Sequence, residues 1–382
     1  MRERFQRMRF NLEEVSGSLG DLGTFIPLTV SMIAVSGLDA GTVLVFAGIF
    51  NVLTGFVFNQ PIPVQPMKAI AAVAIAEQLA PGEIAASGFV AGAIILVLVV
   101  TGLVTWAEKI IPRPVVRGIQ LGVGLKLAAK GLSMVVGLGW FGLDSRLLAV
   151  GAAVIILISN RFKRFPAALV VFTAGLVFVA IGHADVLQGA SLGWAGPKLI
   201  LPSWIQWKSG ILLGTLPQLP LTLLNSVIAV CALSGDLYPG KGIGTRPMAV
   251  SVGLMNLGAC LFGAMPACHG SGGLAGQHRF GARTGGSVVI LGSTKIIIGA
   301  AFGTAAMAVF AVYPAAILGV LLVFAGVELA TPARDCAERD AFFVAAATAG
   351  GILAANTMVG FVLGLCAAAF LLRPPPPLDG GA

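Results

Sequence analysis

Long runs of apolar residues fill this chain, and they restrict its fold more than any other feature of the sequence. Residues 41–58, GTVLVFAGIFNVLTGFVF, contain no charged side chain and approach the roughly 20 apolar residues that cross a bilayer as a helix. Only 10% of the 382 residues are charged, whereas about 25% are charged in a typical soluble domain. We therefore expect an integral membrane protein that crosses the lipid bilayer many times.

Apolar runs bounded by charges, prolines or glycine clusters predict about fourteen membrane spans. They lie near 18–36, 41–58, 66–80, 84–107, 114–130, 147–160, 165–182, 209–232, 247–264, 270–283, 286–310, 312–330, 339–353 and 355–372. The fold class is thus an all-α membrane protein. We expect a first half at 1–182, an extracytoplasmic connector at 183–208, a second half at 209–372 and a flexible tail at 373–382.

Basic residues gather in alternate loops between these runs, as the positive-inside rule requires of cytoplasmic loops. They are Lys109, Arg113 and Arg117, then Arg161, Lys163 and Arg164, then Lys241 and Arg246, then Arg279 and Arg283, then Arg334 and Arg339. Both termini should therefore face the cytoplasm, and we expect a bacterial inner or plasma membrane. The net charge of +8 then reflects topology, so we expect no nucleic acid partner.

Motifs for metal, nucleotide or disulfide chemistry are not found. The five cysteines form no CxxC pair. Cys268 stands beside His269, but no second pair follows at ligand spacing, so we expect no metal. The glycine-rich stretches SGSLGDLG and GSGG lack the GxxxxGK[ST] order of a phosphate-binding loop, which excludes an ATPase of that type. We expect no cofactor.

A weak internal repeat links the two halves. Asn51 stands ten residues before Pro61, and Asn256 stands ten residues before Pro266. In both places a span ends, a proline follows and a short apolar or glycine-rich segment begins. An odd number of spans separates the two copies, so the halves should be inverted in the membrane. Paired interrupted segments of this kind indicate the substrate site of a transporter.

The interrupted segments are predicted to be half-helices. Prolines in QPIPVQP, residues 60–66, favour extended backbone, so a short strand should precede a helix that begins near Met67. In the second half, MPACHG should likewise be extended before a glycine-rich helix start. A helix start presents unpaired N–H groups and a partial positive charge, which favour an anion. Two such starts facing one cavity would form an anion site.

Polar residues near these helix starts are the candidate ligands, and each has a structural alternative. Gln65, Cys268, His269 and Ser271 are candidate donors, with His269 as hydrogen-bond donor or proton carrier. Lys68 either adds charge to the site, pairs with Glu77 or extends to an interface. Asp21, an ionisable group inside a span, either couples protons or braces the first span. Asn225 and Ser226 in the eighth span either contact substrate or join helices. Lys126, Lys130 and Lys295 are assigned structural or interfacial roles.

Four stretches resemble a known family. PVQPMKAIAA at 63–72 and PACHGSGGLAGQHRFGARTG at 266–285 resemble the signature motifs of the molybdate transporter family, which is related to the sulfate permease (SulP) superfamily. GDLGTFIPL at 20–28 and LPLTLLNSVIAVC at 219–231 resemble it too, and the likeness extends over essentially the whole chain. The resemblance implies seven plus seven inverted spans with a core and a gate domain, in which spans 3 and 10 are half-helices behind short strands.

The resemblance also implies a function, a secondary active transporter for a tetrahedral oxyanion such as molybdate, with sulfate as a second candidate, and no enzyme. Substrate would be bound by Gln65, Met67, Lys68, Cys268, His269, Gly270, Ser271 and Gly272, with Thr24, Asn225 and Ser226 lining the remaining wall. Rival hypotheses are a transporter of the same fold for another anion or a nucleobase, and an intramembrane enzyme that uses Cys268 and His269.

Two departures from the wider sulfate permease pattern bear on this hypothesis. The chain stops at LRPPPPLDGGA, so no cytoplasmic regulatory domain is expected, and the eighth span has no carboxylate for proton coupling. Coupling would then fall to Asp21 or His269. Many relatives form dimers through the gate domain, so a homodimer is a further expectation.

Overall fold

The computed structural model describes residues 8–159, 167–188, 193–194 and 196–372. The predicted tail at 373–382 and the predicted basic loop residues Arg161, Lys163 and Arg164 lie outside this part of the chain. The first half contains α2 (Leu12–Ser18), the turn η1 (Leu19–Asp21), α3 (Leu22–Ser36), α4 (Ala40–Phe58), β1 (Val64–Pro66), α5 (Lys68–Ala76), α6 (Pro81–Val100), α7 (Leu103–Ile110), α8 (Arg113–Val136), α9 (Arg146–Ser159) and α10 (Ala167–Gly182).

The second half repeats this order after a short helix, α11 (Ala184–Gln188). It contains α12 (Trp204–Ser209), η2 (Gly210–Thr215), α13 (Leu216–Leu221), η3 (Thr222–Ala229), α14 (Val230–Leu237), α15 (Thr245–Ala259), η4 (Cys260–Phe262), β2 (Ala267–His269), α16 (Ser271–Arg279), α17 (Gly286–Phe302), α18 (Thr304–Ala311), α19 (Ala315–Ala330), η5 (Thr331–Asp335), α20 (Arg339–Ala354) and α21 (Thr357–Leu371). Every predicted span therefore contains helix, although the exact domain boundaries stay predictions.

Two predicted spans are interrupted where the sequence suggested continuous helix. The fourth ends as α6 and restarts after Gly102, whose φ is 76°, as the eight-residue α7. The eleventh ends as α17 and restarts after Gly303, whose φ is 48°, as the eight-residue α18. A positive φ ends a helix at little steric cost only when the residue is glycine. The same break at matching places supports the inverted repeat.

Asn51 and Asn256, the residues that suggested the repeat, have equivalent structural roles. The side-chain oxygen of Asn51 accepts a hydrogen bond of 2.8 Å from the N–H of Val64, the first residue of β1. The side-chain oxygen of Asn256 accepts one of 2.9 Å from the N–H of Ala267, the first residue of β2. Each amide thus fixes the start of a short extended segment, whose backbone groups cannot form the hydrogen bonds of a helix and need other partners.

Glycines at intervals of seven residues bring pairs of helices into backbone contact. On α4 and α17 they are Gly41, Gly48, Gly55, Gly285, Gly292 and Gly299; on α8 and α19 they are Gly124, Gly131, Gly319 and Gly326. A methyl group on Gly48 would lie 2.5 Å from the carbonyl oxygen of Gly292, and the reverse distance is also 2.5 Å. Small residues allow membrane helices to pack at this separation, where dispersion contacts replace the hydrophobic effect.

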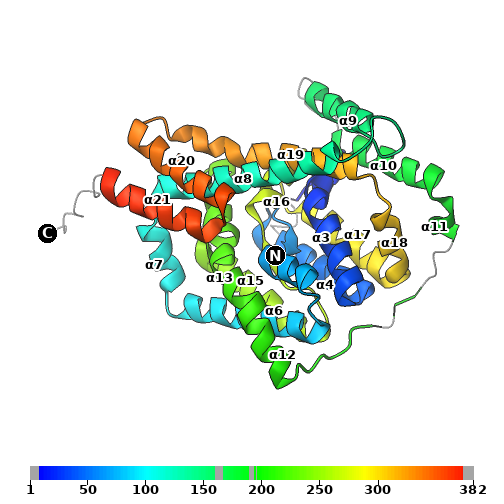
Figure 1. Ribbon diagram of the computed structural model, residues 1–382, viewed down its shortest axis with the longest axis horizontal. Helices are drawn as coiled ribbons and strands as arrows, with labels where there is room; N and C mark the ends of the chain where they lie inside the picture. Colours follow the sequence, from blue (N-terminus) through cyan, green and yellow to red (C-terminus); the bar gives the residue numbers. More distant parts are fainter. Residues whose placement is uncertain (1–7, 160–166, 189–192, 195, 373–382) are drawn as a thin grey trace.

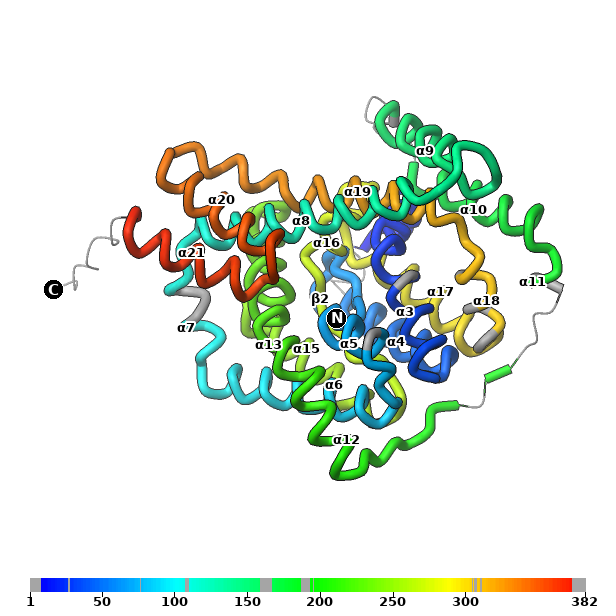
Figure 2. The backbone as a smooth tube through the Cα atoms, viewed as in Figure 1, coloured from blue at the N-terminus to red at the C-terminus, as the bar shows by residue number. Residues whose placement is uncertain are grey.

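The helices form two groups, which lie side by side in Figure 1. We call α8–α10 and α19–α21 the gate group, because α8 packs along α19 and α20, and α20 along α21. The remaining membrane helices form the core group, in which α4 packs on α17 and α6 on α15. The segments α5, β2 and α16 lie in the interior of Figure 2, and α16 also packs on the gate helix α19. The first and eighth spans belong to this core and bring Asp21 and Asn225 toward them.

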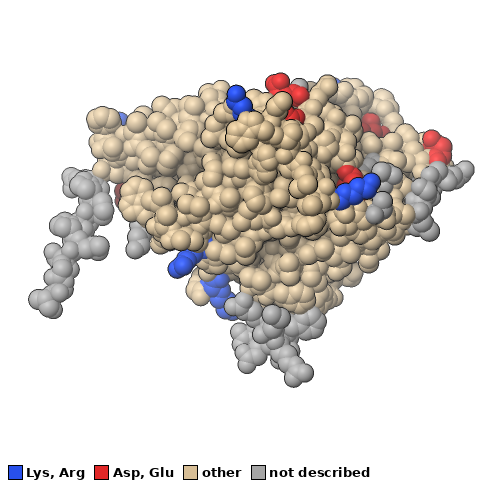
Figure 3. All heavy atoms as spheres, turned by 90° about the horizontal axis from the view of Figure 1, so that it is seen from below, with Lys and Arg blue, Asp and Glu red and all other residues tan. Residues whose placement is uncertain are grey.

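The outer surface fits a lipid environment. Figure 3 shows one face of the molecule, most of which carries no charged side chain. In the described part of the chain, six helical segments are long and apolar enough to cross a bilayer, among them Ala40–Phe58 and Pro81–Val100. Large apolar side chains such as those of Phe370, Leu157 and Val97 are exposed. Such exposure would be unfavourable in water and is expected where the surroundings are hydrocarbon.

A buried carboxylate joins the first span to the eleventh. Glu14 on α2 accepts hydrogen bonds from the N–H groups of Arg283, Thr284 and Ser287, at 3.1, 2.9 and 3.2 Å. These N–H groups lie at the start of α17, where an anion is favoured by the helix dipole. Glu14 therefore has a complete set of partners and a structural role.

Candidate functional site

The two half-helices begin at opposite ends of one strand pair. β1 and β2 are antiparallel, with Val64 opposite His269, Gln65 opposite Cys268 and Pro66 opposite Ala267. Because α5 follows β1 and α16 follows β2, antiparallel pairing makes the two helices start at the two ends of the same ribbon and leave it in opposite directions. Residues more than 200 positions apart in the sequence are thereby joined, as the half-helix prediction required.

The start of α5 is partly satisfied by a side chain. The side-chain oxygen of Gln218 accepts hydrogen bonds from the N–H groups of Ala69 and Ile70, at 2.8 and 3.3 Å. Gln218 lies on α13 between two π-helical stretches that accommodate Pro217 and Pro220. The expectation that both helix starts are bare is therefore wrong for these two N–H groups of α5. The N–H of Lys68 has no acceptor among the described residues.

Lys68 contributes a cation at this helix start. Its ammonium nitrogen is buried and has no hydrogen-bond partner in the described part of the chain. It does not pair with Glu77, which ends α5. Its charge interacts with the Asp21 carboxylate and the Cys268 thiol. A buried ammonium with unused donors is costly unless an anion or water meets it, so Lys68 is poised to contact one.

The start of α16 offers free backbone donors. Gly270 precedes the helix in extended conformation, and no acceptor for the N–H groups of Ser271 or Gly272 is found within the described residues. The hydroxyl of Ser271 donates a hydrogen bond of 2.6 Å to the side-chain oxygen of Asn225. A methyl group on Gly272 would lie 2.5 Å from Leu127 on α8, so this helix start touches the gate group.

Gln65 joins the strand pair to the first span. Its side-chain N–H₂ donates to a carboxylate oxygen of Asp21, while its carbonyl oxygen has no partner in the described structure. A methyl group on Gly270 would lie 1.9 Å from that carbonyl oxygen, and one on Gly273 would lie 2.7 Å from the amide nitrogen. Both glycines are therefore needed to make room for the Gln65 amide between β1 and the start of α16.

His269 and Cys268 are held in the core packing. The imidazole of His269 lies 2.9 Å from the Ser251 hydroxyl through Nε2 and 3.4 Å from the Pro63 carbonyl through Nδ1. Both ring nitrogens thus have protein partners. The thiol of Cys268 lies 3.9 Å from the Pro66 carbonyl and interacts with the Ser226 side chain. No group of three His, Cys, Asp or Glu side chains suited to a metal is found among the described residues.

The remaining predicted ligands surround the strand pair less directly. Met67 is buried, caps α5 and donates its N–H to the Pro266 carbonyl at 2.8 Å. Ser226 is buried on η3, next to Asn225. Thr24 is half-buried on α3, and its hydroxyl makes no hydrogen bond to the described residues. The structure therefore brings Gln65, Lys68 and Asp21 together with Cys268, while Thr24 stays a prediction.

Sequence reasoning missed three residues of this region. Gln218 is not among the residues predicted for the site, although it accepts hydrogen bonds from the start of α5. Lys295 on α17 was assigned a structural or interfacial role, yet its ammonium is buried and lies 3.5 Å from the centre of the Phe25 ring. Arg117 was counted among the topology residues, yet only 2% of its surface is exposed. A cation inside an apolar run was the signal available for Lys295.

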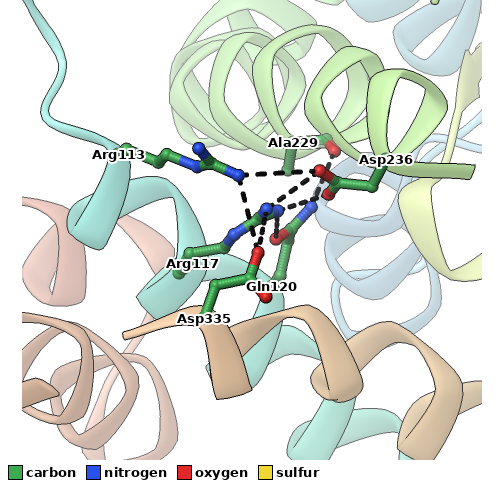
Figure 4. Close-up of polar contacts among 6 residues, drawn as sticks. All are labelled: Arg113, Arg117, Gln120, Ala229, Asp236 and Asp335. Atoms are coloured by element: carbon green, nitrogen blue, oxygen red, sulfur yellow. Dashed lines mark hydrogen bonds and ion pairs between the residues drawn. The ribbon is translucent and has the colours of Figure 1, made fainter. Parts of the chain in front are cut away.

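Arg117 is the centre of a charged cluster that joins the two groups of helices. Its guanidinium on α8 forms two hydrogen bonds to Asp236 on α14, one of them 2.9 Å long, and one of 2.7 Å to Asp335 at the end of η5 (Figure 4). It also donates to Gln120 at 3.0 Å. The exposed Arg113 lies 3.5 Å from Asp335. Because α14 belongs to the core and α8 to the gate, this cluster fastens one to the other.

Comparison with known proteins identifies the family. The family described as "Molybdate transporter of MFS superfamily" matches residues 13–127 and 210–329. Molybdate transporter 2 of Arabidopsis thaliana is 40% identical over 397 aligned positions, which cover 92% of this chain and 85% of that protein. Molybdate transporter 1 of the same plant is also 40% identical and covers 93% of this chain and 87% of its own length. The chain belongs to the molybdate transporter family.

The fold has solved counterparts. The transmembrane domain of the cyanobacterial bicarbonate transporter BicA superposes with a TM-score of 0.59 at 16% identity and covers 92% of this chain and 97% of that one. The predicted fold class, with inverted seven-span halves and a core and gate, is therefore confirmed. This molybdate transporter family member is thus a multi-pass membrane protein of a transporter fold.

Proposed function

We propose that this member of the molybdate transporter family carries molybdate across its membrane as a secondary active transporter, with sulfate as a candidate second substrate. One observation carries the proposal: the half-helices α5 and α16 start at the two ends of one buried strand pair, beside an unpartnered ammonium. Helix starts and a cation favour an anion there. Sequence identity of 40% to two plant molybdate transporters supports the choice of molybdate.

Backbone and side-chain donors would share the binding of the oxyanion. The N–H groups of Ser271 and Gly272 would contact two oxygens, and the Lys68 ammonium would supply formal charge. Asn225, Ser226 and Thr24 would line the opposite wall. Gln65 and Gly270 would shape the gap between the helix starts, and Met67, Cys268 and His269 would hold the strands in register. Charge and hydrogen bonding together strengthen binding of a dianion in a site from which water is largely excluded.

Transport would follow from motion of the core against the gate. The start of α16 meets Leu127 of the gate helix α8, so the site lies at the boundary between the two groups. Alternating access in inverted-repeat transporters commonly moves one group of helices against another around a fixed site. Movement along this boundary would expose the helix starts first to one side of the membrane and then to the other.

Uptake of labelled molybdate into proteoliposomes tests the proposed substrate. We expect accumulation that unlabelled molybdate abolishes, that sulfate reduces, and that bicarbonate and uracil leave unchanged. Competition by bicarbonate or uracil without competition by molybdate would instead identify the rival, a transporter of the same fold for another anion or a nucleobase. Currents far above carrier turnover would identify a channel.

Lys68→Met should weaken molybdate binding about 5- to 150-fold, because a buried ammonium contributes roughly 1–3 kcal/mol to a charge-assisted contact. Equilibrium binding to the purified protein measures the change. The matched control is Lys130→Met, which removes an exposed lysine of α8 and should leave affinity unchanged. Unchanged affinity in Lys68→Met would place the ion away from α5; complete loss with an intact fold would mean that the cation outweighs the helix starts.

The finer points of the proposal concern topology, assembly and chemistry. Both termini would face the cytoplasm, and two copies would associate through the gate group. The prediction of a bacterial membrane stays a prediction, since the relatives named above come from a plant. The protein would not act as an enzyme: Cys268→Ser should retain oxyanion binding, whereas an enzyme with a Cys268 nucleophile would lose its activity.

A further inference from the structure

The Asp21 carboxylate is the one acidic group in direct contact with the described strand pair. It lies on η1, where the first span changes from α2 to α3, and is 2% exposed. One oxygen accepts from the Gln65 amide, and the other has no partner within the described chain. An ionised carboxylate with an empty oxygen is unfavourable in a buried setting. Asp21 therefore lacks the complete set of partners that Glu14 has.

Two buried lysines, Lys68 on α5 and Lys295 on α17, lie within electrostatic range of Asp21. Neither forms an ion pair with Asp21 or a hydrogen bond to the described residues, and the Lys295 ammonium lies over the Phe25 ring. The Cys268 thiol is the remaining titratable group in its field. Among the ionisable groups on elements that pack against η1, Glu14 binds the start of α17, His278 lies 3.9 Å from Glu328, and the Arg279 guanidinium lies over the Phe324 ring.

Charge balance in this cluster depends on the proton of Asp21. With both lysines protonated and Asp21 ionised, the three groups carry a single net positive charge, which leaves a bound dianion only half neutralised. With both lysines and Asp21 protonated, the two ammonium groups match the two negative charges of molybdate. Uncompensated charge is costly in a buried site. Binding of a dianion and binding of a proton to Asp21 should therefore favour each other.

The Gln65 amide links Asp21 to the start of α16. An ionised carboxylate can only accept, so Gln65 must direct its N–H₂ toward Asp21 and its carbonyl oxygen toward Gly270, as the structure has it. That oxygen repels an oxyanion. A protonated Asp21 can donate, which allows the amide to turn over and present its N–H₂ toward α16. No Cβ atom stands in the way of this rotation, because the residues next to the amide are Gly270 and Gly273.

We propose that Asp21 takes up the proton that accompanies the oxyanion. Lys295 completes the charge balance. The Gln65 amide changes its orientation when Asp21 is protonated and so changes which group it presents to the binding site. This inference rests on the proposed function and adds its coupling ion. The transported species would be one proton with one dianion, so uptake would be driven by a pH gradient. Lys295 and Gln65 act on the ion through Asp21 and are positioning residues in this respect.

Binding of labelled molybdate to the purified protein, measured at a series of pH values above that at which molybdate itself protonates, tests the proposal. In the wild type, affinity should rise as pH falls, by up to about tenfold per pH unit for one linked proton. In weakly buffered solution, binding should also take up close to one proton per ion. This second measurement needs no variant, so it applies even if a substitution at Asp21 prevents folding.

Asp21→Asn imitates the protonated carboxyl group and should bind molybdate with an affinity that no longer depends on pH. Proteoliposomes with this variant should equilibrate molybdate but not concentrate it in response to a pH gradient. The matched control is Glu14→Gln, which neutralises another buried carboxylate and should keep the pH dependence of the wild type. A wild type that binds without pH dependence or proton uptake, or an Asp21→Asn variant with the wild-type slope, overturns the proposal. A wild type that binds no molybdate at any pH overturns the proposed function instead.

Discussion

Gly292→Val should prevent accumulation of folded protein. A methyl group at this position would already lie 2.5 Å from the Gly48 carbonyl oxygen and 2.9 Å from Cβ of Asn51. Neither neighbour is a flexible side-chain end, so α4 and α17 must separate. Separation removes contacts along a whole helix pair and moves Asn51 away from the N–H of Val64, which it holds. Overpacking alone costs about 1–3 kcal/mol, and the lost helix contacts add to it.

The measurement is the yield of monodisperse protein in mild detergent, together with its thermal unfolding temperature. Gly258→Val is the matched control, because it makes the same change on helix α15 where a methyl group would meet nothing within 4 Å. We expect the control to be at least as stable as the wild type, because valine has a higher helix propensity than glycine. A Gly292→Val protein as stable as Gly258→Val would show that the glycine contacts between α4 and α17 are not needed for the fold.

These glycine contacts were beyond prediction from the sequence, whereas the extended segments before α5 and α16 were not. Pro61, Pro63 and Pro66 are too closely spaced for regular helix, so the extended segment before α5 follows from local chemistry. The role of Gly48 depends on a partner more than 240 positions away, and the spacing of seven residues acquires meaning only when α17 is known to lie opposite α4. Local stereochemistry can be inferred from a single sequence, whereas the pairing of helices cannot.

The same distinction applies within the candidate site. Gln65 and Cys268 could be assigned to one site because each lies just before a predicted half-helix, and the strand register has them opposite each other. Gln218 could not be assigned, because its contact with the start of α5 depends on how η2 and η3 turn the eighth span. Lys295 was undervalued for a similar reason. An isolated lysine in an apolar run indicates a buried site, but the sequence does not say that its ammonium lies over the ring of Phe25.

Arg117→Met should destabilise the protein by about 3 kcal/mol and strongly reduce uptake. Removing one partner of a buried ion pair leaves the other charge uncompensated, and here two carboxylates, Asp236 and Asp335, would be left facing each other. Arg117→Lys should recover only part of the loss, because an ammonium cannot form the forked pair of hydrogen bonds that the guanidinium makes with Asp236. Thermal unfolding and labelled molybdate uptake measure the two effects.

Arg113→Met is the control, since Arg113 pairs with the same two carboxylates at 3.5 and 4.0 Å but its side chain is 74% exposed. Exposed pairs of this kind contribute about 0–1 kcal/mol. The contrast matters for transport because Arg117 joins the gate helix α8 to α14 of the core, so any motion of the core against the gate must stretch or break its bonds to Asp236. An Arg117→Met protein as stable and as active as Arg113→Met would show that the cluster is only a surface ion pair. The core would then be held to the gate by apolar contacts such as that between Gly272 and Leu127.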